Sequence, residues 1–260
     1  MNTRANGSDR GQERPPQASF EDQWRKRFEA FAAQRDDDAG IAGWSASGLD
    51  ARLRHFASLR APARPGERWL DAGCGAGTYS RLLLDDGLRV VGADYSVPTL
   101  AKARARSPLE MSYVAADARR LPFRARAFDG VICFGVIQAL ASAGPALREL
   151  GALVRPGGQI WVDALNRYCV ANAFEILRRK LSGRPRHLRY ESPAAIKAEL
   201  ASTGFARIQL HWMPIIPARW PALQRLAETR WVRWALRRVP FLGLLACHSF
   251  VVYGERSVAE

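Results

Sequence analysis

A glycine-rich turn after a short apolar strand constrains this chain more than any other feature. Residues 69–78 read WLDAGCGAGT, with glycines at positions 73, 75 and 77. A strand that ends at Asp71 and turns into a helix near Thr78 lets backbone approach a flat, charged ligand closely. The dinucleotide fingerprint would need glycine at position 78, so this spacing disfavours NAD and FAD. An acidic residue just before the first glycine instead suits a cofactor with a positive centre and an ammonium group.

Short apolar segments alternate with helical ones after this turn, which predicts a parallel sheet wound by right-handed crossovers. The predicted strands cover 67–70, 88–93, 111–115, 128–134 and 159–165, with helices at 78–86, 98–105 and 145–153. Asp94 ends the second strand, Asp117 follows the third, and Phe134–Gly135 end the fourth. These positions lie at the carboxyl ends of strands, where ligands bind in open α/β sheets.

The remaining segments predict a cap and two insertions around this sheet. Helical spacing predicts helices at 20–34 and 49–59 near the N-terminus, and at 170–180 and 193–203 after the fifth strand. Strands are expected at 206–212 and 248–253. We therefore divide the chain into a disordered tail (1–19), an N-terminal helical cap (20–60) and one α/β domain (61–260) with insertions at 166–192 and 214–246.

Composition favours a cytoplasmic protein that contacts at most the inner face of the membrane. The first 19 residues lack the apolar core of a signal peptide. The longest uncharged stretch, Val239–Gly254, has 16 residues, whereas a spanning helix needs about 20. The four cysteines stand far apart without a C-x-x-C pair, which disfavours disulfides and a zinc site. No metal ligands are predicted.

The net charge of +14 is concentrated in the last third of the chain. Residues 1–60 carry +1 and residues 61–165 carry +3, whereas residues 166–260 hold 16 basic and 6 acidic side chains, a net +10. Such a surface suits nucleic acid, an anionic membrane or an acidic substrate.

Taken in order, five segments resemble the class I S-adenosylmethionine (SAM)-dependent methyltransferases. They read LDAGCGAGT, GADYS, AADARRLPF, FDGVICFGVIQAL and LVRPGGQIWVDALN. The resemblance implies a seven-stranded, mostly parallel Rossmann-like methyltransferase sheet with helices on both faces, and SAM as cofactor. It further implies that the methionine part of SAM is held by Asp71, Gly73, Cys74, Gly75 and Gly77. Asp94, with Tyr95 and Ser96 beside it, would hold the ribose, Asp117 and Ala118 the adenine, and Phe134 and Gly135 the far wall.

The segment after the fifth strand resembles the ubiquinone-pathway O-methyltransferases, in which such an insertion covers the site and contacts the membrane. That group has a Glu-His pair after the fourth strand, and this chain has Gln138-Ala139. The catalytic base is therefore open: His187 is the first candidate and His55 the second, with Tyr168 and Tyr190 as alternatives. For each histidine, a structural role is the favoured interpretation. The segment 43–48 (GWSASG) either closes over the cofactor or only caps a helix.

The second insertion contains an amphipathic pattern. Trp220, Leu223, Ala227, Trp231 and Trp234 fall at helical spacing, with arginines on the flank. We favour a lid helix whose tryptophans pack in the protein core. The alternative is a surface-lying segment at 217–238 that touches an anionic membrane.

These observations predict a SAM-dependent methyltransferase whose acceptor is small or lipid-soluble, with a hydroxyl oxygen preferred. Two alternatives stay open. One is an RNA methyltransferase that uses the basic last third, although the fourth strand lacks the Asp/Asn-Pro-Pro-aromatic run of base-methylating enzymes and no RNA-binding motif appears. The other is a non-catalytic SAM-binding regulator. The oligomeric state is not predicted.

Overall fold

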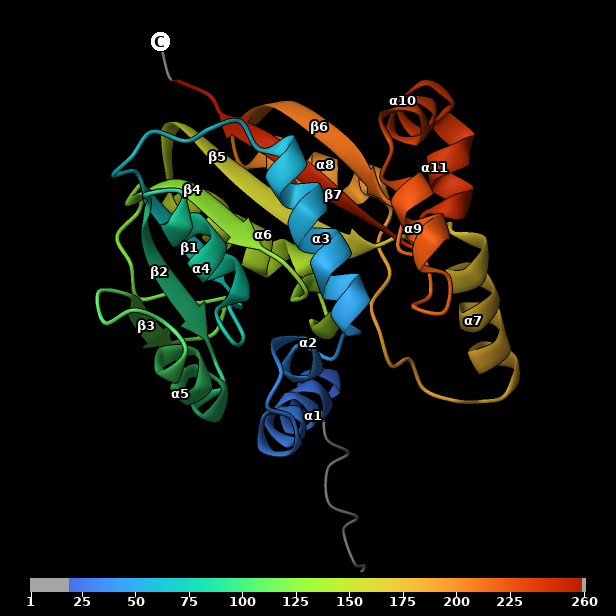
Figure 1. Cartoon of the computed structure of the whole chain (residues 1–260), viewed down its shortest axis with the longest axis horizontal. Helices are drawn as coiled ribbons and strands as arrows, with labels where there is room; N and C mark the ends of the chain where they lie inside the picture. The colour runs from blue at the N-terminus through green and yellow to red at the C-terminus, as the bar shows by residue number, and fades with distance from the viewer. Residues whose placement is uncertain (1–18, 259–260) are drawn as a thin grey trace, which may run out of the picture.

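The computed structural model describes residues 19–258, and a seven-stranded sheet in the order β3-β2-β1-β4-β5-β7-β6 forms its centre (Figure 1). The strands are β1 (Arg68–Ala72), β2 (Arg89–Asp94), β3 (Ser112–Ala115), β4 (Phe128–Cys133), β5 (Val154–Leu165), β6 (Phe205–Met213) and β7 (Ser249–Arg256). β7 runs antiparallel to both of its neighbours, and the other pairs are parallel. The predicted fold class is confirmed. The strand order reverses at β1 and β4, and ligands bind at such a switch point.

Helices cover both faces of the sheet, each over its own apolar core. The helices of these layers are α4 (Thr78–Asp85), α5 (Val97–Ala105), α6 (Ala143–Leu153) and α8 (Pro193–Ser202). Leu147 and Leu150 of α6 and Leu200 of α8 are buried with strand residues such as Val131 in one core. Leu83 of α4 packs in the second core with Ile132. Val131 and Ile132 thus belong to opposite cores, as the alternation of side chains along a strand requires.

Three N-terminal helices form a cap: α1 (Phe20–Gln34), α2 (Asp38–Ile41) and α3 (Ala46–Leu59). Each begins at a side chain that accepts a backbone N–H, namely Ser19, Asp37 and Ser45. The predicted helices at 20–34 and 49–59 are confirmed. α2 was not predicted, because the run Asp36–Asp38 indicates only a break. The predicted tail lies outside the described residues, Ser19 excepted.

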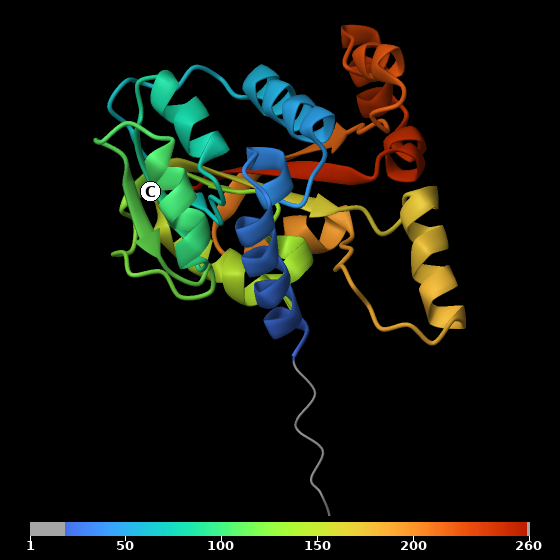
Figure 2. The same cartoon turned by 60° about the horizontal axis from the view of Figure 1, so that its bottom comes forward.

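The two insertions lie together at one end of the molecule in both views (Figures 1 and 2). The insertions contain α7 (Val170–Leu181), α9 (Pro221–Ala227), α10 (Arg230–Arg238) and α11 (Pro240–Ala246). Outside the insertions, a 3₁₀ turn at Ile137–Ala139 follows β4. Among residues 19–258, no helix is long and apolar enough to cross a membrane.

The predicted single helical stripe at 217–238 is wrong in two respects. The chain turns between α9 and α10, where the Thr229 side chain accepts the N–H of Val232 and starts a new helix. The tryptophans do not pack in the core: Trp231 is 81% exposed and Trp234 is 58% exposed. The helical spacing of these residues continues across a break that local sequence does not reveal.

Candidate functional site

A cavity of about 1060 Å³, its open mouth included, lies where β1, β2, β3 and β4 end. Nine residues of the predicted cofactor site line it, namely Gly73, Cys74, Gly75, Asp94, Tyr95, Asp117, Ala118, Phe134 and Gly135. Asp71, Gly77 and Ser96 are not among its lining residues. The strand ends thus bring most of the predicted site together.

The glycine loop has the backbone shape that a cradle requires. Gly73 and Gly75 have φ angles of +79° and +52°, in the left-handed region. A Cβ atom on Gly73 would stand 2.0 Å from Cγ2 of Val136, so only glycine fits there. A Cβ atom on Gly75 would meet no heavy atom within 4 Å, so the loop has free space on that side.

Asp94 joins this loop to the second strand. Its Oδ2 accepts the N–H of Gly75 at 3.0 Å, and its Oδ1 accepts the N–H of Ser96 at 2.8 Å. Burial raises the pKa of Asp94, while these two hydrogen bonds oppose the shift. Each carboxylate oxygen keeps a further lone pair, so the group can accept two ribose hydroxyls.

Asp71 lies at the end of β1 and is fully buried. Ser80 Oγ of α4 donates to its Oδ2 at 2.6 Å. Burial raises the pKa of Asp71 to about 7, and the hydrogen bond from Ser80 opposes this. A nearby cation would stabilise the ionised form of Asp71. Asp71 does not line the cavity, so its contact with the ammonium group of SAM stays a prediction. The donor set and the open cradle fit SAM.

Asp117 connects the far side of the cavity to the cap. Its Oδ2 lies 2.7 Å from Nη2 of Arg119, and this contact lowers the pKa of Asp117. Arg119 also pairs with Glu21 of α1. These ion pairs attach the first cap helix to the loop after β3.

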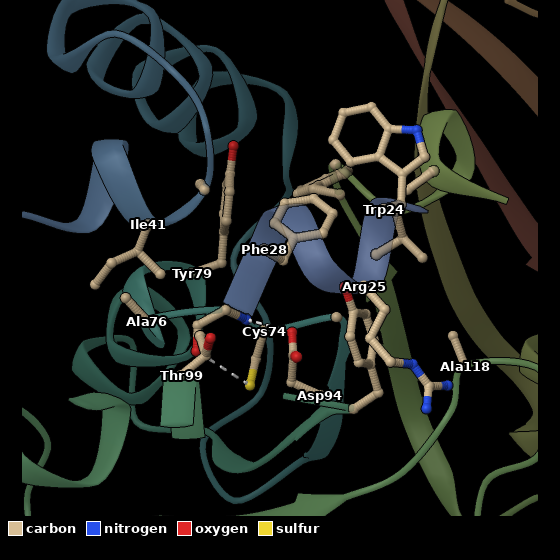
Figure 3. A pocket seen from close by; sticks show the side chains of 18 of the residues that line it. Trp24, Arg25, Phe28, Ile41, Cys74, Ala76, Tyr79, Asp94, Thr99 and Ala118 are labelled. Carbon is tan, nitrogen blue, oxygen red and sulfur yellow. Dashed lines mark hydrogen bonds between the residues drawn. The ribbon is translucent and has the colours of Figure 1, made fainter. Parts of the chain in front are cut away.

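Aromatic and aliphatic side chains of the cap line the rest of the cavity. Trp24 and Phe28 come from α1 and Ile41 from α2, and Figure 3 shows them across the cavity from Asp94. Trp44 packs so close to Gly135 that a Cβ atom there would stand 2.8 Å from its ring. Within the segment 43–48, Trp44 lines the cavity and Ser45 caps α3. The sequence reasoning missed the role of α1, although its apolar spacing was the available signal.

A buried ion pair holds this wall in place. Arg52 of α3 lies 3.1 Å from Asp163 of β5, with side chains only 5% and 3% exposed. The other carboxylate oxygen of Asp163 accepts the N–H of Gly135 at 2.7 Å. The Arg52 guanidinium stacks 4.6 Å from the centre of the Trp44 ring. No sequence signal identified this group, because Arg52 and Asp163 are 111 residues apart.

None of the described histidines lines the cavity. His187 lies in the loop between α7 and α8, where burial and the nearby Arg179 lower its pKa. His55 is buried in α3 and lines a different cavity. Tyr168 and Tyr190 do not line the cofactor cavity either. The structure thus does not bring the candidate bases to the cofactor residues. Residues 19–258 contain no cluster of histidine, cysteine and acidic side chains that could hold a metal ion.

Comparisons with known proteins agree with this geometry. Residues 70–162 match a family described as "Methyltransferase domain". The demethylmenaquinone methyltransferase of Beutenbergia cavernae is 44% identical over 117 residues, which cover 44% of this chain and 48% of that protein. The ubiquinone biosynthesis O-methyltransferase of Azorhizobium caulinodans is 30% identical over 181 residues, which cover 65% of this chain and 72% of that protein.

Solved structures share the fold. An S-adenosylmethionine-dependent methyltransferase from Mesorhizobium loti superposes with a TM-score of 0.60 at 20% identity, covering 80% of this chain and all of that one. This similarity is evidence of the fold alone. The match to the Beutenbergia protein spans about half of that relative's length, whereas the Azorhizobium match spans more than two thirds.

Proposed function

The chain belongs to the class I SAM-dependent methyltransferase family, and on this premise we propose that it methylates an oxygen of a small, lipid-soluble acceptor. One observation carries the proposal: the glycine-loop cavity continues into an aromatic and aliphatic wall built by the cap. Two relatives are named for menaquinone and ubiquinone synthesis, which supports an acceptor of the same solubility. The acceptor would lie under α1.

The residues of this chain would bind the cofactor, align the acceptor with it and exclude water. Bound SAM supplies a methyl group on a positively charged sulfur, which an acceptor displaces in line. The loop at 73–77 and Asp71 would hold the methionine part, Asp94 the ribose, and Asp117 with Ala118 the adenine. Trp24 and Phe28 line the cavity and would cover the acceptor. Such a cover would speed the displacement, since alignment and removal of water account for most of its rate.

The acceptor oxygen also has to lose its proton, and we propose that it is acidic, as in a phenol or enol. Arg25 lines the cavity, and its guanidinium lies 5.3 Å from the centre of the Tyr95 ring and extends toward Ala118 (Figure 3). This is the side assigned to the ribose and the adenine, so we give Arg25 no role at the acceptor oxygen. An acidic acceptor ionises without a base from the protein. Neither His187 nor His55 lines the cavity, so nothing in the geometry supports either as the base. Their assignment as bases stays a prediction.

Labelled SAM and a series of phenolic and quinol acceptors of rising hydrophobicity test this function. We expect methyl transfer that increases with acceptor hydrophobicity and that begins at a lower pH for the more acidic phenols. His187→Ala should leave the rate unchanged, and a complete loss would instead identify His187 as the base. SAM binding without transfer to any acceptor would favour the regulator. Transfer to RNA would favour the RNA methyltransferase.

We also propose that residues 217–238 contact an anionic membrane at its cytoplasmic face. Trp220, Leu226 and Trp231 are 50%, 56% and 81% exposed, and arginines flank them. Tryptophan beside arginine on short surface helices suits the boundary between headgroups and acyl chains. Such a position would place the cap close to a lipid-soluble acceptor.

Co-sedimentation with vesicles tests the membrane contact. The wild-type protein should sediment with vesicles that contain phosphatidylglycerol and much less with phosphatidylcholine alone. Trp220→Ser combined with Trp231→Ser should weaken sedimentation. The matched control removes two exposed apolar side chains elsewhere, Val97 and Leu109. Equal sedimentation of the two double variants would contradict this contact.

A further inference from the structure

A second cavity lies at the C-terminal end of α3, whereas the N-terminal part of this helix lines the cofactor cavity. The second cavity encloses about 900 Å³, open space at its mouth included, between the end of α3, β6 and α10. Three arginines of α10 line it at helical spacing, namely Arg230, Arg233 and Arg237. His55, Ser58 and His211 line the opposite side. The proposed methyl transfer uses none of the three arginines, and His55, an untested candidate base, does not line the cofactor cavity.

These arginines lack the carboxylate partners that several arginines have beside the cofactor cavity. Arg52, Arg81 and Arg119 each pair with an aspartate near the cofactor cavity. Within residues 19–258, Arg230, Arg233 and Arg237 form no ion pair; Arg233 instead donates to Ser58 Oγ at 2.6 Å.

The nearest acid of the same insertion is already engaged. Both carboxylate oxygens of Glu228 accept hydrogen bonds from Arg54, at 2.8 and 2.9 Å. The second cavity therefore collects positive charge that no described carboxylate neutralises.

A buried polar atom in the same cavity also lacks a partner. His55 is 7% exposed, and its Nε2 has no hydrogen-bond partner among the described residues. Burial and the nearby His211 and Arg233 lower the pKa of His55 to about 4, so the imidazole is neutral at neutral pH. A buried polar atom without a partner is costly. A neutral imidazole with a free N–H can donate it to an anion.

We infer that this second cavity binds a phosphate group, carried by a lipid headgroup or by a soluble phosphate compound. Guanidinium groups match the oxygens of phosphate in charge and in the spacing of their donors. His55 adds a neutral donor on the opposite wall, whereas the Ser58 hydroxyl already donates to the backbone carbonyl of His55 at 2.7 Å. Trp234 lines the same cavity and is 58% exposed, so an apolar side chain stands at the position where a lipid would enter.

Calorimetry with inorganic phosphate and sedimentation with phosphatidylglycerol vesicles separate the two sources. The test variant is Arg230→Gln combined with Arg237→Gln. The matched control is Arg225→Gln combined with Arg238→Gln, which removes the same charge from α9 and α10 at positions that do not line the cavity. His55→Leu is a third variant that leaves the charge of the arginines unchanged. Melting temperature and SAM binding of every variant establish that it is folded.

Binding of either probe should become about tenfold weaker or more in the test variant, because each lost charge-assisted hydrogen bond is a strong one. Binding should weaken less than about threefold in the control variant, where the lost charges act only through the long-range electrostatic field. Binding of free phosphate assigns a soluble source, and binding of vesicles alone assigns a headgroup. His55→Leu should weaken the binding of the same probe. Equal losses in the test and control variants, or no binding of either probe, would overturn the inference whether or not methyl transfer is observed.

Discussion

The cofactor region and the two insertions treat charge and apolar surface in opposite ways. Around the cofactor cavity these acids have partners within the chain: two amides for Asp94, Arg119 for Asp117 and Arg52 for Asp163. In α10 the arginines that line the second cavity have no carboxylate partner among residues 19–258, and Trp231 is 81% exposed. In the first region the chain itself neutralises or hydrogen-bonds its charged groups. In the second region the arginines are the groups for which we propose an external phosphate as partner.

The largest expected effect follows from breaking the buried ion pair. Arg52→Ala leaves Asp163 buried without its partner, so we expect the free energy of unfolding to fall by about 3–5 kcal/mol. Arg178→Ala removes an ion pair on α7 whose side chains are 51% and 27% exposed, and should cost at most about 1 kcal/mol. Urea denaturation measures both. Similar losses would show that the two regions do not differ in this respect.

The next effect concerns SAM affinity. Asp94→Ala removes the acceptor of two backbone N–H groups and of the ribose hydroxyls, so we expect affinity to fall about 100-fold, at 1.5–3 kcal/mol for each hydrogen bond to a charged group. Asp85→Ala on the exposed surface of α4 is the control and should leave affinity unchanged. Calorimetry measures both, and an unchanged affinity in Asp94→Ala would remove the basis of the cofactor site.

A third effect, spread over several pH units, is the pH dependence of stability that Asp71 causes. Its pKa is about 7 in the folded chain and near 3.8 when unfolded. Between these values the folded state binds more protons, so this group makes the free energy of unfolding fall as pH rises from about 4 to 7, by at most about 1.4 kcal/mol per pH unit.

Three histidines, of which His55 is buried and His211 and His248 are partly buried, act in the opposite direction over an overlapping pH range. Burial lowers the pKa values of His55, His211 and His248 to about 4, so they destabilise the fold as pH falls below about 6.5. The Asp71 contribution therefore has to be read as the difference between wild type and Asp71→Asn. We expect that difference to vary with pH between 4 and 7. A constant difference would mean that Asp71 does not titrate in this range.

The smallest effect is expected on the exposed face of α10. Trp231→Ser should change the free energy of unfolding by less than about 0.5 kcal/mol, because the side chain makes few contacts to lose. The same variant should still weaken vesicle sedimentation. A stability loss of several kcal/mol would mean that Trp231 packs against protein, and would remove the contrast between the two regions.

The sequence predicts the parts that depend on nearby residues. The glycine loop, the strand ends and the order of helices and strands follow from local periodicity and turn chemistry, so the sheet and most of the cofactor site could be predicted. The Arg52–Asp163 pair could not be, because its partners become neighbours only in the folded chain. The second cavity likewise joins His55 to Arg233, two residues that local spacing never relates. The break at Thr229 was missed because helical spacing continued across it.

The position of β7 sets the order in which the sheet can be completed. This last strand lies between β5 and β6, and β6 pairs with no other strand among residues 19–258. The four strands that end at the cofactor cavity, and β5 beside them, are all synthesised by Leu165, and they can pair while the rest of the chain is still on the ribosome. β6 cannot join the sheet until Ser249–Arg256 has emerged. During synthesis, the cofactor half is therefore free to form before the insertions acquire their final position.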